Sequence, residues 1–138
     1  MKVSYTYRGK ALRVLDGDTV QVDLDLGFQL RFLAIIRLAR INAPEVVGET
    51  KAAGIAATKA MAELLGCNYA IGVVKGGFAP AKAITVRVLK ADKYGGRWVG
   101  EIFIGGACVN DQMVSLGHAV PYLVDRDLPD DPFAGDPE

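Results

Sequence analysis

The chain has 138 residues, a length that fits one domain with a sizeable hydrophobic core. Hydrophobic residues make up 51% and charged residues 23%, which is typical of a globular protein and excludes a disordered one. No apolar run approaches the roughly 20 residues needed to span a bilayer, so we expect no membrane segment. The N-terminus lacks the apolar stretch of a signal peptide, so we expect a cytoplasmic protein, or a secreted one whose signal has been removed.

Charge is unevenly distributed along the chain, although the net charge is zero. Residues 125–138 contain six acids and one base, a net charge of −5, which leaves +5 for the residues before them. We therefore predict a folded domain over 1–124 and a disordered acidic tail over 125–138. A basic body suits a polyanionic partner, but a solvated surface with a solubilising tail explains the same charges.

The N-terminal third of the chain predicts three consecutive strands. Residues 10–15 and 19–26 flank the turn sequence Asp16-Gly17-Asp18, and the second run alternates Val or Leu with Gln or Asp, as a half-buried strand does. Residues 29–41 form a longer strand, rich in Leu, Ile and Phe. Because both of its faces are apolar in the middle, we expect this strand to be central in the sheet.

A helix follows the third strand. Residues 49–65 are dense in Ala, Lys, Glu, Met and Leu, and Gly66 is a typical C-terminal stop. Its apolar stripe is predicted to be formed by Ala53, Ala56, Ala57, Ala60, Met61 and Leu64. A connection that contains Gly and Pro then occupies residues 66–82.

Two more strands and a short helix complete the predicted domain. Residues 84–89 and 98–104 are the fourth and fifth strands, and Asn110 is predicted to N-cap a helix that ends at Leu116. Three strands, a helix, two strands and a short helix follow the plan of an OB fold. We therefore predict an α+β, mainly β protein built on a five-stranded OB barrel, a scaffold that suits oligonucleotides.

Polar residues at the predicted strand ends are suited to phosphate chemistry. Asp18, Asn42 and Glu45 supply oxygen ligands, which hard cations prefer. Arg37 and Arg97 supply planar forks that match phosphate oxygens. A cation and two guanidinium groups would neutralise the charge that grows on a five-coordinate phosphorus, and a nearby carboxylate could take a proton from the attacking water.

Each of these residues also has a structural explanation when it is judged alone. Asp-Gly-Asp is common in turns, and a salt bridge could account for Arg37 within an apolar strand. Pro44-Glu45 is favourable chemistry for a helix start, and Gly95-Gly96 is typical of a hairpin turn. The order and the joint chemistry of the segments therefore carry the functional prediction.

In order and spacing, these segments resemble the signature blocks of the staphylococcal nuclease (thermonuclease) family. The resemblance runs from about Lys10 to Tyr122 and rests on Asp-Gly-Asp-Thr-Val, Arg-Leu-x-x-Ile-Asn-Ala-Pro-Glu and Asp-Lys-Tyr-Gly…Arg. It implies a five-stranded OB barrel and a calcium-dependent nuclease. The implied reaction is hydrolysis of phosphodiester bonds in DNA and RNA, with single strands favoured, to leave 5′-hydroxyl and 3′-phosphate ends.

The resemblance also implies roles for the residues that match the family's pattern. Arg37 and Arg97 match two arginines that bind the scissile phosphate and stabilise its transition state, and Glu45 matches the carboxylate proposed as general base. Lys93 and Tyr94 match residues that touch a terminal phosphate of the bound nucleotide. We expect all five to face the substrate.

The implied Ca²⁺ ligands include one departure from the family. Asp18 matches a ligand aspartate, and Ala43 matches the position that gives its backbone carbonyl to the metal. Asn42 stands where the family has a second aspartate, so the site loses one negative charge and should bind calcium more weakly. Tyr122 falls near a tyrosine that lines the nucleotide pocket.

Other departures leave a second reading open. Gly96 is an extra residue before Arg97, relative to the family's pattern. An alternative alignment puts Gly96 at the position of the family's arginine. Arg97 is favoured because Trp98 and the residues after it then continue the strand. The connection over 66–82 is longer than usual, and the acidic tail stands in place of a C-terminal helix. The alternative function is a non-catalytic OB domain, descended from such a nuclease, that binds nucleic acid or protein.

Overall fold

The computed structural model describes residues 5–71, 74–77, 82–92 and 95–122. The predicted substrate residues Lys93 and Tyr94, and the predicted acidic tail, lie outside the described residues. None of the described helices is long and apolar enough to cross a membrane.

Strands dominate the chain, with one long and one short α-helix. Their bounds are β1 (Tyr5–Asp16), β2 (Thr19–Gly27), β3 (Leu30–Leu38), β4 (Ile41–Asn42), the 3-10 helix η1 (Gly48–Thr50), α1 (Lys51–Leu65), β5 (Asn68–Ile71), β6 (Val74–Gly77), β7 (Ala83–Ala91), β8 (Arg97–Ile104), β9 (Ala107–Cys108), α2 (Val109–Ser115) and β10 (Val120–Pro121).

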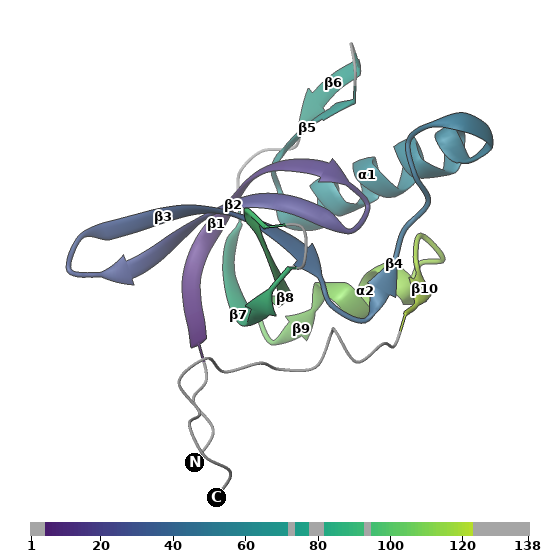
Figure 1. The fold of residues 1–138 in the computed structure, drawn as a ribbon. Coiled ribbons are helices and arrows are strands. Elements are labelled where there is room, and N and C mark those ends of the chain that lie inside the picture. Colours follow the sequence, from purple (N-terminus) through teal and green to yellow (C-terminus); the bar gives the residue numbers. More distant parts are fainter. Residues whose placement is uncertain (1–4, 72–73, 78–81, 93–94, 123–138) are drawn as a thin grey trace, which may run out of the picture.

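Five of these strands close into a barrel. β1 pairs antiparallel with β2 and with β7, β2 pairs with β3, and β7 pairs with β8. A parallel pairing of β3 with β8 completes the circuit. Figure 1 shows α1 along one side of this barrel and α2 near the β4–β10 pair. The architecture is an OB-like α+β fold, so the predicted fold is confirmed.

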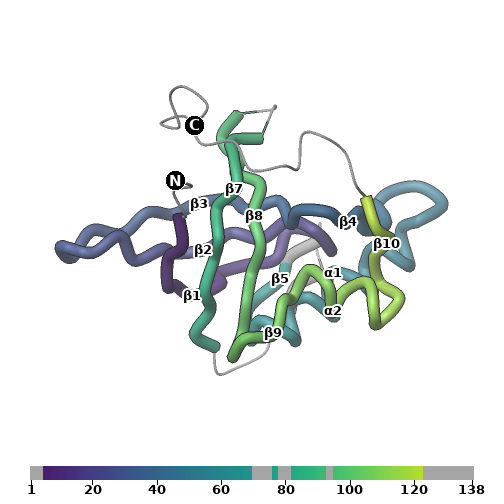
Figure 2. Tube along the Cα trace, turned by 90° about the horizontal axis from the view of Figure 1, so that it is seen from below, coloured from purple at the N-terminus to yellow at the C-terminus, as the bar shows by residue number. Residues whose placement is uncertain are grey.

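The core lies inside the barrel, as the alternation of side chains along the strands requires. Val20 and Val22 of β2 and Ile36 and Leu38 of β3 are fully buried. Met61 from α1 joins the same cluster, so the helix closes one side of the barrel. Each such side chain contributes roughly 1.5–3 kcal/mol through burial. Figure 2 shows these strands from below, with the β2–β3 hairpin extending away from the helices.

The long helix ends where the sequence predicts, but its buried face is rotated by about one residue. Gly66 adopts a left-handed φ of 66°, and Cys67 N donates to Ala62 O at 3.0 Å. A Cβ at Gly54 would lie 2.4 Å from Glu45 O, so a glycine is required where the 45–46 backbone crosses the helix. The buried face is Gly54, Ala57, Thr58, Met61, Ala62 and Leu65.

Three strand predictions need correction. β1 begins at Tyr5, not at residue 10, because its first half pairs with β7. β3 ends at Leu38, not at residue 41, since Arg40 has a φ of 67° and turns the chain. The outer part of β3, from Leu30 to Leu33, is exposed, so only the inner half of this strand is central. The connection over 66–82 contains the β5–β6 hairpin.

The prediction that Asn110 caps α2 is wrong. The N-cap residue is Cys108, and Asn110 lies inside the helix with its side chain fully buried. Its amide donates to Ala39 O at 3.0 Å and to Gly100 O at 3.1 Å, and its Oδ1 accepts from Ile102 N at 3.1 Å. Asn110 therefore satisfies backbone groups of the barrel wall beneath the helix.

We predict that Asn110→Ala destabilises the fold by about 3 kcal/mol, because three buried backbone groups each lose a hydrogen bond. Urea denaturation followed by circular dichroism would measure the change in the free energy of unfolding. Ser115→Ala, at an exposed position of the same helix, is the control and should change stability little. Equal stabilities of the two variants would contradict the role given to Asn110.

Candidate phosphate and cation site

The start of β2, the end of β3 and the start of β8 meet on the outer wall of the barrel. Thr19 pairs with Arg37 across β2 and β3, and Arg37 pairs with Val99 across β3 and β8. Paired residues point to the same face of a sheet, so all three side chains lie on the face opposite the main core cluster, where Thr19 and Val99 are themselves buried. Among the predicted site residues, this wall carries Arg37, Asp18 directly precedes β2, and Arg97 begins β8.

Asp18 is held firmly at the start of β2. Its Oδ1 accepts from Thr19 Oγ1 at 3.0 Å, and its Oδ2 accepts from Ala43 N at 2.9 Å. The backbone Asp18 O also accepts from Leu38 N at 2.8 Å. Gly17 allows this approach, because a Cβ there would lie 2.7 Å from Ala43 Cβ. Asp18 and Ala43, two predicted metal ligands, are therefore brought together.

Asp16 is a member of this site that sequence reasoning missed. Asp16 Oδ1 accepts from Asp18 N at 3.0 Å. Burial, followed by the hydrogen bond and charge of Asp18, raises the pKa of Asp16 to about 7. Two carboxylates therefore face one another. The sequence signal was the first acid of Asp-Gly-Asp, which lies two residues before Asp18.

Arg37 is a nearly buried cation, 9% exposed. Its Nη1 donates to Leu38 O at 2.5 Å, its Nη2 donates to Ile41 O at 3.0 Å, and the Tyr122 ring lies 5.7 Å from its Cζ. Within the part of the chain that the structure describes, no carboxylate forms an ion pair with Arg37. A buried charge of this kind strongly favours an anion.

Arg97 begins β8 and contacts a buried acid. Arg97 Nη2 lies 2.9 Å from Asp92 Oδ2. The same oxygen has no partner with hydrogen-bond geometry, so we treat the contact as an ion pair only. Gly96 has a φ of 66°, a conformation that an arginine would adopt only under strain, so Arg97 is the residue placed on the wall. Asp92 was also missed by sequence reasoning, although it lies in one of the signature blocks.

The two arginines project from the same face of the barrel wall. Arg97 pairs with Ile35, two residues before Arg37 on the neighbouring strand. Strand spacing and rise place their Cα atoms roughly 8 Å apart, within reach of one phosphate for two long side chains. The structure therefore places Arg37 and Arg97 on neighbouring strands of one wall.

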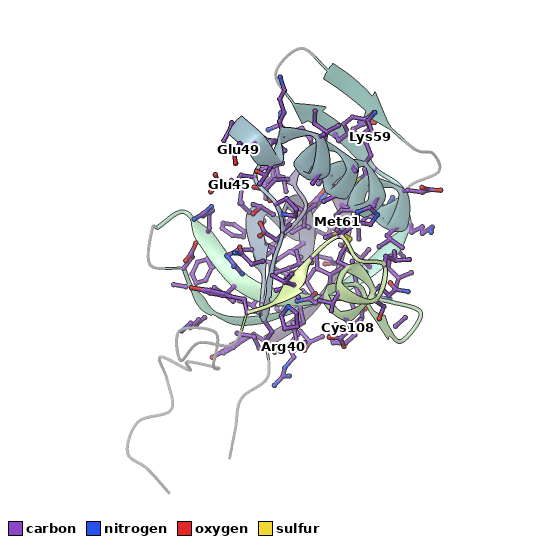
Figure 3. The ribbon with its side chains drawn as sticks, turned by 90° about the vertical axis from the view of Figure 1, so that its right-hand side faces the viewer. Arg40, Glu45, Glu49, Lys59, Met61 and Cys108 are labelled. Carbon is purple, nitrogen blue, oxygen red and sulfur yellow. The ribbon has the colours of Figure 1, made fainter. Side chains whose placement is uncertain are left out.

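Asn42 and Glu45 lie on the exposed segment beside Asp18. Asn42 pairs with Val120 in the β4–β10 ladder and follows directly after the carbonyl that binds Arg37. Glu45 is exposed, and its backbone oxygen accepts from Thr50 Oγ1 at 2.7 Å. Figure 3 shows Glu45 on the same side of the ribbon as Glu49. Both predicted residues therefore flank the wall rather than point into the core.

Tyr122 and Arg40 tie the end of the described chain to this wall. Tyr122 N donates to Arg40 O at 2.8 Å, which sets the Tyr122 ring over Arg37. The Arg40 guanidinium itself pairs with Glu101 and Asp111. Tyr122 is thus part of the site, whereas Arg40 serves the structure around it.

The donors present fit a weakly held hard cation. Asp16 and Asp18 supply two close carboxylates, and the bond from Ala43 N to Asp18 Oδ2 places the backbone of Ala43, next to Asn42, beside them. Among the described residues, no group of three or more His, Cys, Asp or Glu side chains is arranged to hold a metal. Calcium accepts mixed carboxylate, amide, carbonyl and water ligands, and fewer charges mean weaker binding.

Comparisons with known proteins add no family assignment. No protein-family model matches the chain, and a search of the curated proteins finds no match.

Proposed function

We propose that this chain is a calcium-dependent nuclease that hydrolyses phosphodiester bonds in the manner of the staphylococcal nuclease family, which its signature blocks resemble. The observation that carries the proposal is the buried guanidinium of Arg37 without a carboxylate partner among the described residues, beside a second arginine on the same wall. A phosphate diester is an anion that two arginine forks can bind and whose transition state they can stabilise.

Arg37 is the better placed of the two arginines. Two carbonyls fix its guanidinium plane, and the Tyr122 ring packs near it, so the remaining N–H groups are oriented in advance. Arg97 is partly neutralised by Asp92, which holds it near the wall. We assign Arg37 to the scissile phosphate throughout the reaction, and Arg97 to the charge that increases in the transition state.

The cation site lies beside these arginines. Asp18, Asp16, Asn42 and the Ala43 carbonyl would hold Ca²⁺, which supplies Lewis-acid polarisation of a phosphate oxygen when it is bound. The chain's own part is to keep two carboxylates close together at the start of β2, an arrangement that attracts a cation.

Glu45 is the proposed general base. Its exposed carboxylate stands two residues after Ala43, where it can accept a proton from water. The oxygen of that water forms a bond to phosphorus as the bond to the 5′ oxygen breaks. The products are a 3′-phosphate and a 5′-hydroxyl, and the 5′ oxygen takes up a proton.

The test uses single-stranded DNA with calcium or with a chelator, and a matched pair of glutamates. Wild-type protein should cleave only with calcium and leave 3′-phosphate ends, identified by mass spectrometry. Glu45→Gln should lower the cleavage rate by roughly 10²- to 10⁴-fold. Glu49→Gln, at another exposed glutamate nearby, should leave the rate unchanged.

A non-catalytic nucleic-acid-binding domain is the second candidate. Asn42, which replaces a carboxylate, favours it because the cation site is then less charged. Binding of single-stranded DNA without cleavage at any calcium concentration would establish this alternative and overturn the nuclease.

Asn42→Asp gives a prediction specific to the cation site. A third acid near Asp16 and Asp18 raises the attraction for a divalent ion, so the calcium concentration at half-maximal activity should fall by roughly tenfold or more. Calcium titration of the cleavage rate measures it. Asn68→Asp, at an exposed asparagine in the β5–β6 hairpin, is the control. An unchanged midpoint would remove Asn42 from the metal site.

A further inference from the structure

The outer half of β3 presents an unpaired strand edge. β3 pairs with β2 along its whole length, but its pairing with β8 covers only Ile35 to Leu38. In the described ranges, no other strand pairs with the segment from Leu30 to Ala34 on that second side. Figures 1 and 2 show this hairpin projecting beyond the barrel. An unpaired edge exposes backbone N–H and C=O groups that can bind another strand.

This edge is apolar, which is unusual for an exposed strand. Leu30 is 59% exposed and Leu33 is 60% exposed, on opposite faces, and Phe32 between them is also exposed. Strand edges in soluble proteins are normally protected by Lys, Pro or a bulge. Here the one charge in the segment, Arg31, is paired with Asp23 of β2. Nothing within the segment itself therefore discourages pairing with another strand.

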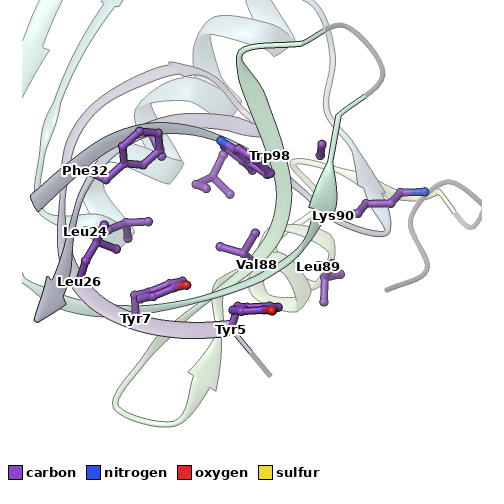
Figure 4. Close-up of a pocket in the computed structure, with 12 residues that line it drawn as sticks. Tyr5, Tyr7, Leu24, Leu26, Phe32, Val88, Leu89, Lys90 and Trp98 are labelled. Atoms are coloured by element: carbon purple, nitrogen blue, oxygen red, sulfur yellow. The ribbon is translucent and has the colours of Figure 1, made fainter. Parts of the chain in front are cut away.

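A cavity beside the same edge is apolar too. At the mouth of the barrel, about 550 Å³ is enclosed mainly by apolar and aromatic side chains, including Phe32, Leu26, Tyr7 and Trp98. Figure 4 shows these side chains surrounding an open centre. Trp98 is partly exposed at this mouth. The open space lies on the Phe32 side of the edge.

The hairpin tip adds an independent sign of contact. Phe28 is 97% exposed and has a φ of 54°, and Gln29 has a φ of 65°. A bulky residue rarely adopts this left-handed conformation, and two-residue turns of this type favour Asn and Gly. A large apolar side chain held outward in an unfavourable conformation points to a role for that side chain in binding.

We propose that this face is the interface of a homodimer in which β3 of one copy pairs antiparallel with β3 of a second copy. The free segment has Phe32 at its midpoint, so a two-fold axis there places Phe32 against Phe32 of the second copy. Leu30 then lies opposite Ala34, and each Arg31 lies opposite Leu33. No like charges meet, and the segment is complementary to itself, as an isologous interface requires.

The charges near this face favour a second copy over other partners. Arg31 is paired with Asp23, and Arg8 lies opposite Asp25 in the β1–β2 register. Positive and negative groups therefore balance, whereas a nucleic acid or an anionic membrane needs a basic surface. An uncharged apolar strand edge matches another copy of the same edge.

The area is also adequate for a dimer. The exposed apolar side chains of the hairpin are Leu26, Phe28, Leu30, Phe32 and Leu33. With aromatic side chains of roughly 150–250 Å² each, they offer several hundred Å² per copy. A standard interface buries roughly 800 Å² per partner, and the strand backbone and the cavity rim supply the remainder.

The first experiment measures the mass of the full chain by sedimentation velocity at micromolar concentrations and above. Wild type should sediment as a dimer, and Leu30→Lys combined with Leu33→Lys should sediment as a folded monomer. Leu116→Lys, at a leucine 57% exposed at the end of α2, is the control and should stay dimeric. A monomeric wild type overturns the proposal, even if the chain then binds vesicles or single-stranded DNA through this face.

The second experiment tests the register and does not depend on the lysine variants folding. Phe32→Cys should form an intermolecular disulfide on mild oxidation, because directly opposite residues of antiparallel strands lie within disulfide reach. Leu116→Cys is the matched control and should stay uncrosslinked. A Phe32→Cys protein that crosslinks no faster than this control overturns the pairing about Phe32.

Discussion

Arg37→Lys should lower the rate of single-stranded DNA cleavage by roughly 10²- to 10³-fold with calcium present. Lysine keeps the positive charge but cannot donate to Leu38 O and Ile41 O while also presenting two parallel N–H groups to a phosphate. The loss of cleavage rate therefore measures the contribution of the planar guanidinium fork rather than that of the positive charge. Rates under single-turnover conditions, with saturating protein, separate this effect from weakened binding.

The matched control for Arg37→Lys is Arg87→Lys. Arg87 lies on β7 and pairs with Glu101 at the protein surface, away from the proposed phosphate site. Its replacement should leave the rate unchanged. Thermal melts of both variants check that the fold is intact. If Arg37→Lys cleaves within a few-fold of wild type, Arg37 does not stabilise the transition state and the central assignment fails.

Sequence reasoning recovered those parts of the fold that follow from local patterns. Alternation in β2 and the stop at Gly66 are determined by neighbours in the chain. The stop agrees with the structure, and Val20, Val22 and Leu24 are buried as the alternation predicts, although Asp23 is buried too and Leu26 is exposed. The outward placement of Arg37 also follows from strand alternation, since Ile36 and Leu38 on either side are buried. These features need no knowledge of tertiary contacts.

The errors arise where distant segments decide the outcome. Asn110 has the composition of a helix cap, but carbonyls of Ala39 and Gly100 require a buried donor at that place. The sequence predicts burial for the outer half of β3 because its residues are hydrophobic, as in a buried strand, but this half is exposed. Only the limited length of the β3–β8 ladder reveals that nothing in the described chain covers it.

The candidate site shows the same division between residue type and geometry. The motif identified Asp18 and Arg97, but it gave no reason to expect Asp16 against Asp18 or Asp92 beside Arg97. Those contacts depend on how the turns fold. A sequence motif does not specify which side chains are buried or which form ion pairs. Burial and ion pairing determine which charges are neutralised by a partner.

Asp18→Asn should abolish both calcium binding and most of the activity. The amide can keep the local structure, because its oxygen can accept from Ala43 N while its NH₂ group donates to Thr19 Oγ1. The change also removes one of two facing carboxylates, so the calcium-free protein should be no less stable than wild type. The expected loss is therefore one of cation binding rather than of folding.

Thermal melts with and without calcium give a readout independent of cleavage. Calcium at a hundred times its dissociation constant should stabilise wild type by about 2.7 kcal/mol, and this gain should vanish in Asp18→Asn. Asp25→Asn, at an exposed aspartate of the same strand, should keep the full gain because it lies far along β2 from the turn. A ligand stabilises a protein only if it binds the folded chain better than the unfolded one. An equal calcium-induced gain in stability in wild type and Asp18→Asn would therefore place the cation at another site.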